Sequence, residues 1–539
     1  MGTNPENSSG HHDRVSQQQS AAAIMNDENS TPHQSSHADK EDEPSKEDEP
    51  PTENELPTDD ALPAYSALSE FQRSSLLSVA SFAAAISPAS TTTYYPAVTS
   101  LARDLHVSVT LINLTISTYQ GLAPSVTAAF SDRFGRRPAY IICFTINFAA
   151  NLGLALQNDY TSLIVLRCVQ SSSSSGTVAL AQAVLDDLTT SEQRGKFLAY
   201  MSIGFIMGPA LGPVIGGLLS QYLGWRAIFW FLLILGGIFM VTILIFFRET
   251  NRSIVGDGSI PPQRWNRSLF QLFRKDNLVP NRESLEKKVT GVNPLASLRI
   301  LASKENFIVC IYGGLLFAGF SSVTSVFASQ LQERYNYNEV QIGLCYLPIG
   351  VGSFLSRWTT AKLIDWNFKR EADKQGLAIV KNRKQDMSKY DVEKTRLVIA
   401  FPLIFLTCGF VIAYGWLMEY KIHVAAVLVI VFILANVITG ALVASTALLT
   451  DINLGNGASL GAAMNLTRCL MGAGGVAGIT PVINAIGIGY AATITAGIWI
   501  ATLPALWLVY SKGHSWRKAK AAMGDEEREE SVSAAPAQP

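Results

Sequence analysis

Long apolar stretches separated by polar segments dominate this chain from about residue 75 onward. A helix needs about 20 apolar residues to cross the hydrocarbon core of a bilayer, and each stretch is long enough to do so. The pattern predicts an all-α membrane protein with twelve transmembrane helices, six on each side of a long polar insert. We expect the spans near 75–97, 108–130, 139–157, 161–185, 197–220, 225–247, 306–330, 340–362, 397–417, 423–448, 458–483 and 488–510.

The polar segments divide the chain into five predicted parts. Residues 1–70 are rich in Ser, Glu, Asp and Pro and bury too little apolar surface to offset the entropy of ordering, which predicts a disordered tail. An N-terminal six-helix half is expected over 71–248 and a C-terminal six-helix half over 305–511. A linker with short helices, 249–304, joins them, and a polar tail, 512–539, ends the chain.

Basic residues are unevenly distributed among the loops. Lys and Arg concentrate after the second and fourth spans, in 249–304 and 366–396, and in the C-terminal stretch. The alternate loops hold little more than Arg103, Arg334 and Lys421. Because loops rich in Lys and Arg remain in the cytoplasm, the linker and both termini are predicted to be cytoplasmic.

Composition excludes several classes of protein. The chain has 539 residues, of which 48% are hydrophobic and 16% are charged, whereas soluble domains carry about 25% charged residues. A net charge of −1 gives no reason to expect a nucleic-acid partner. The six cysteines lie in apolar segments without a histidine cluster, so we expect neither a metal site nor a cofactor. The sequence has no phosphate-binding GxxxxGK[ST] segment and no catalytic constellation, which disfavours an ATP-driven pump and an enzyme.

The two halves repeat each other at two places. The segment 128–137 after span two has a small residue, an apolar residue, an Asp and a basic pair at the same offsets as 361–370 after span eight. The exits of spans four and ten, 184–188 and 448–452, are also similar. Internal repeats are common in secondary transporters, and they predict that the halves are pseudo-symmetric. The alternative is that Asp with Lys or Arg is ordinary loop chemistry.

The turn between spans two and three combines a carboxylate with guanidinium groups. Gly135 permits a sharp reversal of the backbone. Asp132 can pair with the basic residues beside it, since carboxylate and guanidinium groups form charge-assisted hydrogen bonds. We predict a latch that breaks when the protein changes conformation, with the following members: Asp132, Arg133, Gly135, Arg136, Arg137 and, at the exit of span four, Asp187. The alternative is a basic loop that only fixes orientation.

Two arginines lie inside predicted spans. Arg167 and Gln170 are in span four and Arg468 is in span eleven. A buried guanidinium costs about 2.5–3.5 kcal/mol even on a lenient insertion scale, so such residues mark cavities or proton pathways. The alternative for Arg167 is a structural role in satisfying backbone carbonyls. No Asp or Glu lies in the middle of a span, which leaves Asp132 and Asp187, at the membrane edge, as candidate proton carriers.

Span five is rich in glycine and proline. The four-residue spacing of its glycines places them on one helical face, where a neighbouring helix can approach closely. The prolines remove backbone donors and favour a bend. The predicted residues of this helix are Gly204, Gly208, Pro209, Gly212, Pro213, Gly216 and Gly217.

These motifs together resemble the major facilitator superfamily. The turn at 128–137 resembles its signature loop, with Ala128 in place of the usual glycine, and Arg167-Cys-Val-Gln170 resembles its intramembrane Arg-x-x-Gln motif. Span five resembles the antiporter motif of drug:proton exchangers. The stretches 224–231 and 256–265 are similar to those of the fungal twelve-spanner drug:proton antiporters of the quinidine-resistance type. The resemblance covers about 70–512, and it departs from the family at 171–175, where serines replace glycines.

The resemblance implies a proton-coupled antiporter that exports a small organic compound by alternating access. The compound would be a drug, a toxicant or a secreted metabolite such as an organic acid, and Arg167 would take part in proton coupling. The expected partners are this compound, protons and membrane lipid, and the protein is expected to be monomeric in the plasma membrane, with the vacuolar membrane as the alternative. A proton-independent facilitator or importer, and a non-transporting sensor, remain as other functions.

Overall fold

The computed structural model describes residues 68–117, 123–189, 194–273, 296–374, 391–453 and 457–533. Within these ranges the chain is helical and contains no strand. They belong to one compact unit that extends over 64–539. The predicted disordered tail lies outside the described residues except for its last three, as does the end of the predicted C-terminal tail. The predicted domain boundaries therefore stay predictions.

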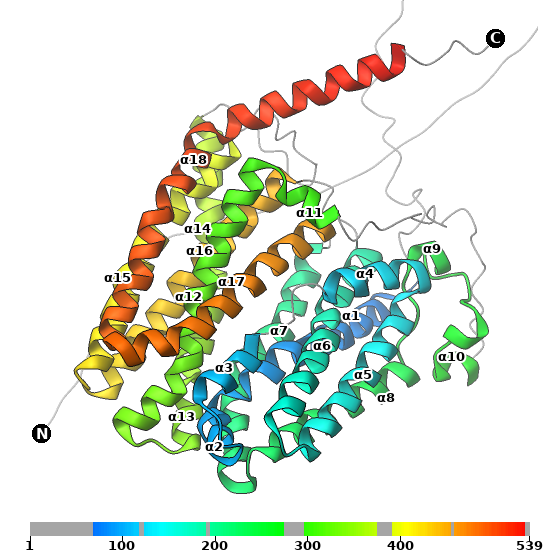
Figure 1. Ribbon diagram of the computed structural model, residues 1–539. Coiled ribbons are helices and arrows are strands. Elements are labelled where there is room, and N and C mark those ends of the chain that lie inside the picture. The colour runs from blue at the N-terminus through cyan, green and yellow to red at the C-terminus, as the bar shows by residue number, and fades with distance from the viewer. Residues whose placement is uncertain are drawn as a thin grey trace, which may run out of the picture. The chain divides into compact units, whose positions relative to one another are not determined.

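Each of the twelve predicted spans coincides with one long helix or with a pair of consecutive helices (Figure 1). Helices α1, α5, α6, α7 and α8 each match one span of the first half, and α3 and α4 share the second span on either side of 118–122. The bounds are α1 Glu70–Thr92, α3 Val109–Ser117, α4 Ala123–Phe134, α5 Arg136–Leu156, α6 Tyr160–Leu188, α7 Arg194–Leu223 and α8 Arg226–Ile245.

The second half repeats this arrangement, with its second span again divided between two helices. The bounds are α12 Lys304–Tyr335, α13 Glu339–Cys345, α14 Leu347–Lys374, α15 Val392–Glu419, α16 Val424–Ile452, α17 Gly457–Ile486 and α18 Ile488–Ser533. Helices α14 and α18 run well past the predicted ends at 362 and 510. The residues that follow these spans include many Lys, Glu, Arg and Ala, which favour helix, so the apolar pattern ends before the helix does.

Short helices occupy the connections. After α1, the 3-10 helix η2 (Tyr95–Ala97) and α2 (Val98–Asp104) lead to α3. In the described parts of the predicted linker, the short helices are α9 (Arg252–Val255), η3 (Arg264–Asn266), α10 (Leu269–Phe273) and α11 (Ala296–Leu301).

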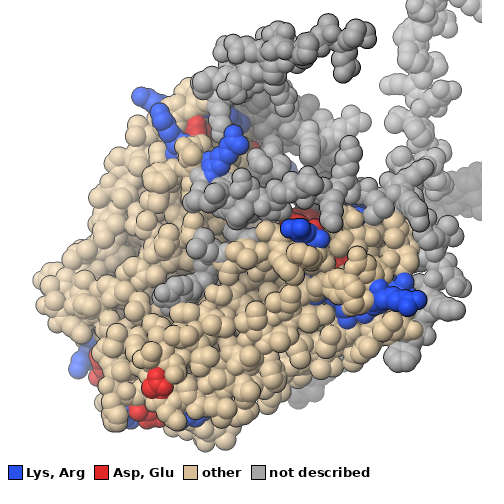
Figure 2. Space-filling view, turned by 45° about the vertical axis from the view of Figure 1, so that its right-hand side comes forward, with Lys and Arg blue, Asp and Glu red and all other residues tan. Residues whose placement is uncertain are grey.

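Seven of the described helices are by themselves long and apolar enough to cross a membrane: α5, α8, α12, α15, α16, α17 and α18. Their outward surfaces are apolar. On α8, exposed Trp230, Ile234, Ile238 and Val241 recur every three or four residues and so lie on one face. Figure 2 shows a broad area that carries neither acidic nor basic side chains. An apolar exterior around a packed interior is what a lipid environment requires.

The two halves meet at one end of the bundle. We call the end that carries the loops after α4, α6 and α14 the basic end, and the end that carries η2, α2 and residues 336–338 the opposite end. At the opposite end the rings of Tyr95 and Tyr346 stack with centroids 5.5 Å apart. Ser100 donates a hydrogen bond to Glu339, whose backbone N–H donates to Gln221 at 3.1 Å. These contacts join the first half to the second.

Candidate functional site

The predicted turn at the basic end is present. Helix α4 ends at Phe134 and α5 begins at Arg136, so Gly135 alone separates them. Its φ of 111° lies in a region that favours glycine. A Cβ atom there would also collide with the carboxylate of Glu249. Both constraints make glycine necessary at this position.

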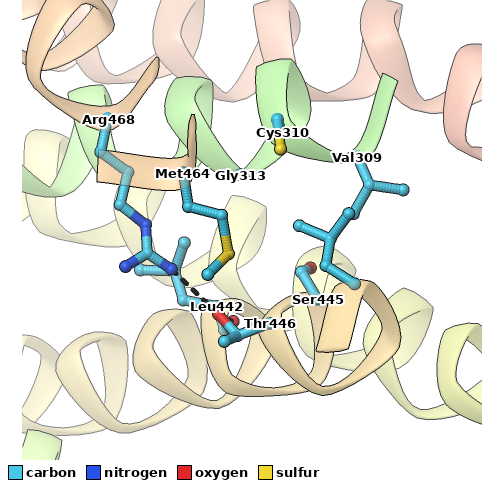
Figure 3. Close-up of a pocket in the computed structure, with 9 residues that line it drawn as sticks. Val309, Cys310, Gly313, Leu442, Ser445, Thr446, Met464 and Arg468 are labelled. Atoms are coloured by element: carbon cyan, nitrogen blue, oxygen red, sulfur yellow. Dashed lines mark hydrogen bonds between the residues drawn. The ribbon is translucent and has the colours of Figure 1, made fainter. Parts of the chain in front are cut away.

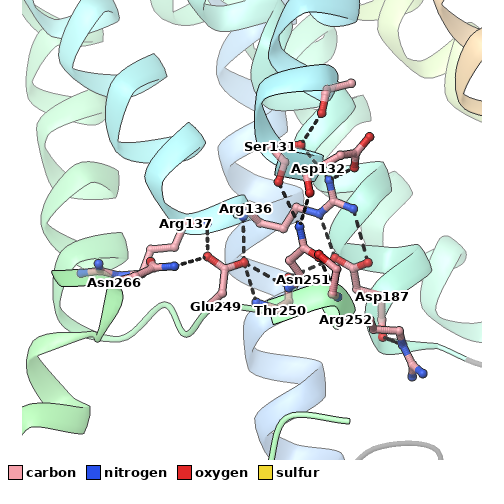
Figure 4. Close-up of polar contacts among 12 residues, drawn as sticks. Ser131, Asp132, Arg136, Arg137, Asp187, Glu249, Thr250, Asn251, Arg252 and Asn266 are labelled. Carbon is pink, nitrogen blue, oxygen red and sulfur yellow. Dashed lines mark hydrogen bonds and ion pairs between the residues drawn. The ribbon is translucent and has the colours of Figure 1, made fainter. Parts of the chain in front are cut away.

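The guanidinium of Arg136 connects three helices (Figure 4). Its Nε donates to Asp187 Oδ2 of α6 at 2.9 Å, and its Nη1 donates to Ser131 Oγ of α4 at 2.7 Å and also to Asp132 Oδ1. The side chains of Arg136 and Asp187 are about nine-tenths buried, with exposed fractions of 9% and 10%. The structure therefore brings together Asp132, Arg136 and Asp187, at the membrane edge where the sequence placed them.

Glu249 is the centre of this cluster, and sequence reasoning missed it. It follows α8 and is 4% exposed. Its carboxylate accepts from the backbone N–H groups of Arg136 (2.7 Å), Arg137 (3.2 Å), Thr250 (3.1 Å) and Asn251 (3.0 Å) and from Asn266 Nδ2 (2.8 Å). A carboxylate at the start of α5 satisfies its free N–H groups and complements the helix dipole. An acidic residue two positions after the predicted span 225–247 was the available signal.

The remaining predicted members of the latch, Arg133 and Arg137, make fewer described side-chain contacts between helices than Arg136 does. The side chain of Arg133 is exposed and lies 5.4 Å from the ring of Phe134. Arg137 directs its Nη2 to the carbonyl of Leu244 on α8 at 3.1 Å. All of the contacts described for this cluster lie in the first half and the segment that follows it, so they hold α4, α5, α6 and α8 together as one body. The role of the cluster as a conformational latch stays a prediction.

The pairing of Arg136 with Asp187 can be measured by a double-mutant cycle. We expect Arg136→Gln and Asp187→Asn each to lower the thermal unfolding midpoint of the purified protein, because each leaves a buried charge without its partner. The double variant should lose less than the two single losses combined, with a coupling energy of about 1–3 kcal/mol. Additive losses would mean that the ion pair contributes nothing of its own.

The second half has an ion pair at the counterpart of Asp187. Asp451 accepts from Arg396 Nε at 2.8 Å, so the arginine comes from the start of α15. The basic pair of the repeated segment, Lys369 and Arg370, lies on α14, which continues to Lys374 without a turn, and Arg370 lies 5.4 Å from the ring of Trp366. The tight turn that follows α4 in the first half is therefore not repeated at this place.

Arg167 is enclosed within the first half. It is 2% exposed, its Cζ lies 4.4 Å from the centroid of the Tyr94 ring, and its Nη1 donates to Gln170 Oε1 at 2.6 Å and to the Ser90 carbonyl at 3.3 Å. Gln170 donates in turn to Asn151 Oδ1 at 2.6 Å. These partners are all uncharged, so they orient the guanidinium without neutralising it.

The glycines of α7 pack against both halves. Gly208, Gly212 and Gly216 face α1, where a Cβ at Gly216 would collide with the carbonyl of Thr93. Gly217 faces the carbonyl of Glu339 in the second half, and Pro213 lies against Gly343 of α13. Pro209 and Pro213 lie inside the helix, and at Gly204 the structure describes only the backbone. The close approach expected for a glycine face is present, and it includes contacts between the halves.

Arg468 lies on α17, where its side chain reaches a narrow pocket between α12, α16 and α17. Its Nη2 donates to Thr446 Oγ1 at 2.9 Å. Arg357 of α14 is close enough to interact with it electrostatically. Sequence reasoning missed Arg357, although it lies within the predicted span 340–362.

A cluster of possible metal ligands lies at the basic end of the second half. Ligand atoms of Asp391, Glu393 and His514 lie within 4.8 Å of one another. Both carboxylates are ion-paired, Asp391 with Lys394 at 2.7 Å and Glu393 with Arg517 at 3.2 Å. Asp391 therefore stabilises the start of α15, and Glu393 joins the start of α15 to α18 through Arg517.

Comparison with known proteins identifies the class of the fold. Residues 80–478 match the family model of the Major Facilitator Superfamily. The chain is 72% identical to MFS-type transporter R5 of Phoma sp. over 84% of this chain and 87% of the relative, and 69% identical to MFS-type transporter clz19 of Cochliobolus lunatus over 87% and 90%. It is 32% identical to Citrate exporter 1 of Aspergillus niger over 83% and 87%. The predicted all-α membrane fold, with twelve transmembrane helices in two six-helix halves, is confirmed.

Proposed function

From the premise that this chain belongs to the Major Facilitator Superfamily, a family of membrane transporters, we propose that it is an antiporter that exports a small organic compound in exchange for protons. The two halves rock about a central site and expose it to one side of the membrane at a time. The basic end faces the cytoplasm, together with both termini, since its loops carry most of the Lys and Arg. The membrane is the plasma membrane.

The observation that carries this proposal is the packing of α7. Its glycine face contacts α1 of its own half and the backbone of α13 in the other half. The glycine face lets α7 pack closely against both halves, which closes the opposite end of the bundle. The central site is then exposed to the cytoplasm at the basic end. The similarity to Citrate exporter 1 of Aspergillus niger supports outward transport of an organic acid.

Transport by purified protein in proteoliposomes tests the proposal. Radiolabelled citrate and a panel of cationic drugs should be followed with and without an imposed pH gradient. We expect movement that depends on the gradient and that falls at least about tenfold in Arg167→Ala, because tenfold corresponds to only about 1.4 kcal/mol and this side chain orders a buried network. Arg167→Lys retains the charge but loses the planar contacts, so it should fall between the two. Movement that ignores the pH gradient would contradict proton exchange.

A specific observation favours a proton-independent facilitator as the second candidate. No Asp or Glu occupies the middle of a predicted span, and the ionisable groups described as interacting with Arg167 are Tyr94, Tyr95 and Cys168. Among the described residues around Arg167 there is therefore no carboxylate to carry a proton. The pH inside vesicles distinguishes the two candidates when the compound moves down its own gradient, since only the exchanger moves protons in the opposite direction.

A further inference from the structure

One face of α14 carries tryptophans and basic residues in alternation. Trp358, Lys362, Trp366 and Arg370 follow one another at intervals of four residues, which places them in one row along the helix. The two tryptophans are 60% and 57% exposed, and both basic residues are exposed as well. We call these four residues the aromatic–basic row. Contiguous exposed aromatic surface marks a candidate contact site.

The rings of the row hold its cations. Lys362 Nζ lies 3.6 Å from the centroid of the Trp358 ring, and Arg370 Cζ lies 5.4 Å from the centroid of the Trp366 ring. A cation over an aromatic face is attracted by the ring, but the ring does not neutralise it. In the part of the chain that the structure describes, neither cation has an ion pair or a hydrogen bond. Their N–H donors are therefore available to an acceptor.

The row faces away from the helix bundle. On the other side of α14, Thr360 packs against Gly440 of α16. Trp358 and Lys362 are each two positions from Thr360, and residues two apart on an α-helix point in roughly opposite directions. Toward the middle of the span the row continues with the apolar Phe354, which is 52% exposed. The row therefore lies on the outer surface of the bundle.

A contact with α15 places the row at the edge of the membrane. Asn367 Nδ2 donates to the carbonyl of Thr395 at 2.7 Å, and the predicted span of α15 begins two residues later, at 397. Trp366 is therefore level with the edge of the hydrocarbon. With a rise of 1.5 Å per residue, Lys362 and Trp358 lie about 6 and 12 Å closer to the membrane centre. Trp and Lys are common at this depth, but an ammonium group there is costly unless water or an anion compensates for it.

Arg468, the basic residue of the predicted span 458–483, has a partner within the protein. Figure 3 shows it in a narrow pocket, where its Nη2 donates to Thr446 Oγ1 at 2.9 Å. The described side chains offer no such acceptor to Lys362 or Arg370. An acceptor for these two cations comes from outside the protein, and at the edge of a membrane the available anions are lipid headgroups.

The charge around the row suits an anionic headgroup. Lys369 adds a third exposed cation next to Arg370, and the exposed Asp365 is the one carboxylate of the stretch 362–370, which leaves a net charge of +2. A zwitterionic headgroup brings a cation of its own, which this surface repels. A headgroup with net negative charge gains from the basic residues without that loss.

We propose that the aromatic–basic row binds an anionic phospholipid of the leaflet at the basic end. The lipid phosphate accepts from Lys362 and Arg370 on either side of Trp366, since basic side chains and phosphate form charge-assisted hydrogen bonds. The acyl chains lie along Trp358 and Phe354. The inference goes beyond the proposed transport function, and it depends neither on the exported compound nor on proton exchange.

Native mass spectrometry of the detergent-purified full-length protein tests the site. The probes are phosphatidylglycerol, which is anionic, and phosphatidylcholine, which is zwitterionic, with the same acyl chains. We expect half occupancy by the first phosphatidylglycerol at a concentration at least about tenfold lower than by phosphatidylcholine. In the double variant Lys362→Gln/Arg370→Gln the concentration of phosphatidylglycerol required should rise at least about tenfold, with phosphatidylcholine little changed. Trp366→Leu should weaken both lipids, because it removes the aromatic contact.

A matched control removes the same number of cations from the opposite end. Arg103→Gln/Lys421→Gln, which replaces two exposed residues there, should bind phosphatidylglycerol as the unchanged protein does. All of these positions are exposed, so the thermal midpoints without lipid should also be unchanged.

Several results would overturn the lipid site. Equal phosphatidylglycerol binding in Lys362→Gln/Arg370→Gln and the unchanged protein would do so, as would an equal loss in the control or equal binding of the two lipids. Displacement of the lipid by glycerol 3-phosphate at the same concentration would assign the row to a soluble phosphate instead. A dimer that is present in the unchanged protein and lost in the double variant would assign it to a second copy of the chain.

Discussion

Glu249→Ala is expected to be among the most damaging single substitutions at the basic end. It removes a buried acceptor of five hydrogen bonds, two of them from the first backbone N–H groups of α5. Removing one partner from a buried charged cluster typically costs about 3–5 kcal/mol, because the remaining groups stay desolvated. The thermal midpoint of the purified protein should fall accordingly, and transport should fall with it as α5 loses its anchor beside Arg136.

Two companion variants make the Glu249 experiment specific. Glu249→Gln preserves the shape and one acceptor oxygen but turns an N–H₂ group toward donors, so its loss should be intermediate. Glu333→Ala removes a carboxylate from an exposed position of α12 and should change stability by about 0.5 kcal/mol or less. Equal stability of Glu249→Ala and Glu333→Ala would show that the cluster does not hold the first half together.

The contacts of Glu249 illustrate what the sequence could and could not predict. The twelve spans follow from the length of apolar runs, because the bilayer sets the length of each helix. The grouping of Asp132 with Arg136 follows from their separation of only four residues across a predicted tight turn, since carboxylate and guanidinium groups form charge-assisted hydrogen bonds. Glu249, in contrast, accepts hydrogen bonds from the backbone N–H groups of residues 136 and 137, which are more than a hundred positions away. A sequence does not indicate which distant backbone groups a side chain will contact.

The same limit applies to the second half. The repeat aligned Asp451 with Asp187, but Asp451 pairs with Arg396 of α15, a residue outside the repeated segments, so the repeat could not identify this partner. Arg357 looked like any other polar residue near the end of a span. Its proximity to Arg468 depends on how α14 and α17 pack, which periodicity does not specify.

Gly217→Ala and Gly343→Ala are expected to abolish most transport while the protein remains folded. In each case the new Cβ would lie against backbone of the other half, the carbonyl of Glu339 for Gly217 and that of Pro213, at 2.5 Å, for Gly343. Backbone cannot move aside as a side chain can, so the halves can no longer meet at the opposite end. Transport should fall at least about tenfold, since this clash costs well over 1.4 kcal/mol.

The accessibility of an introduced thiol distinguishes this conformational effect from unfolding. In a background without the six native cysteines, Val340→Cys on α13 should react faster with a membrane-impermeant maleimide when Gly217→Ala is added, because the opposite end stays separated. Gly409→Ala on α15, where no atom lies within 4 Å of the new Cβ, should leave both transport and labelling unchanged. If Gly217→Ala instead left the labelling rate as it was and transport intact, the two halves would not need to close through α7, and the sealing role that carries the proposed mechanism would be wrong.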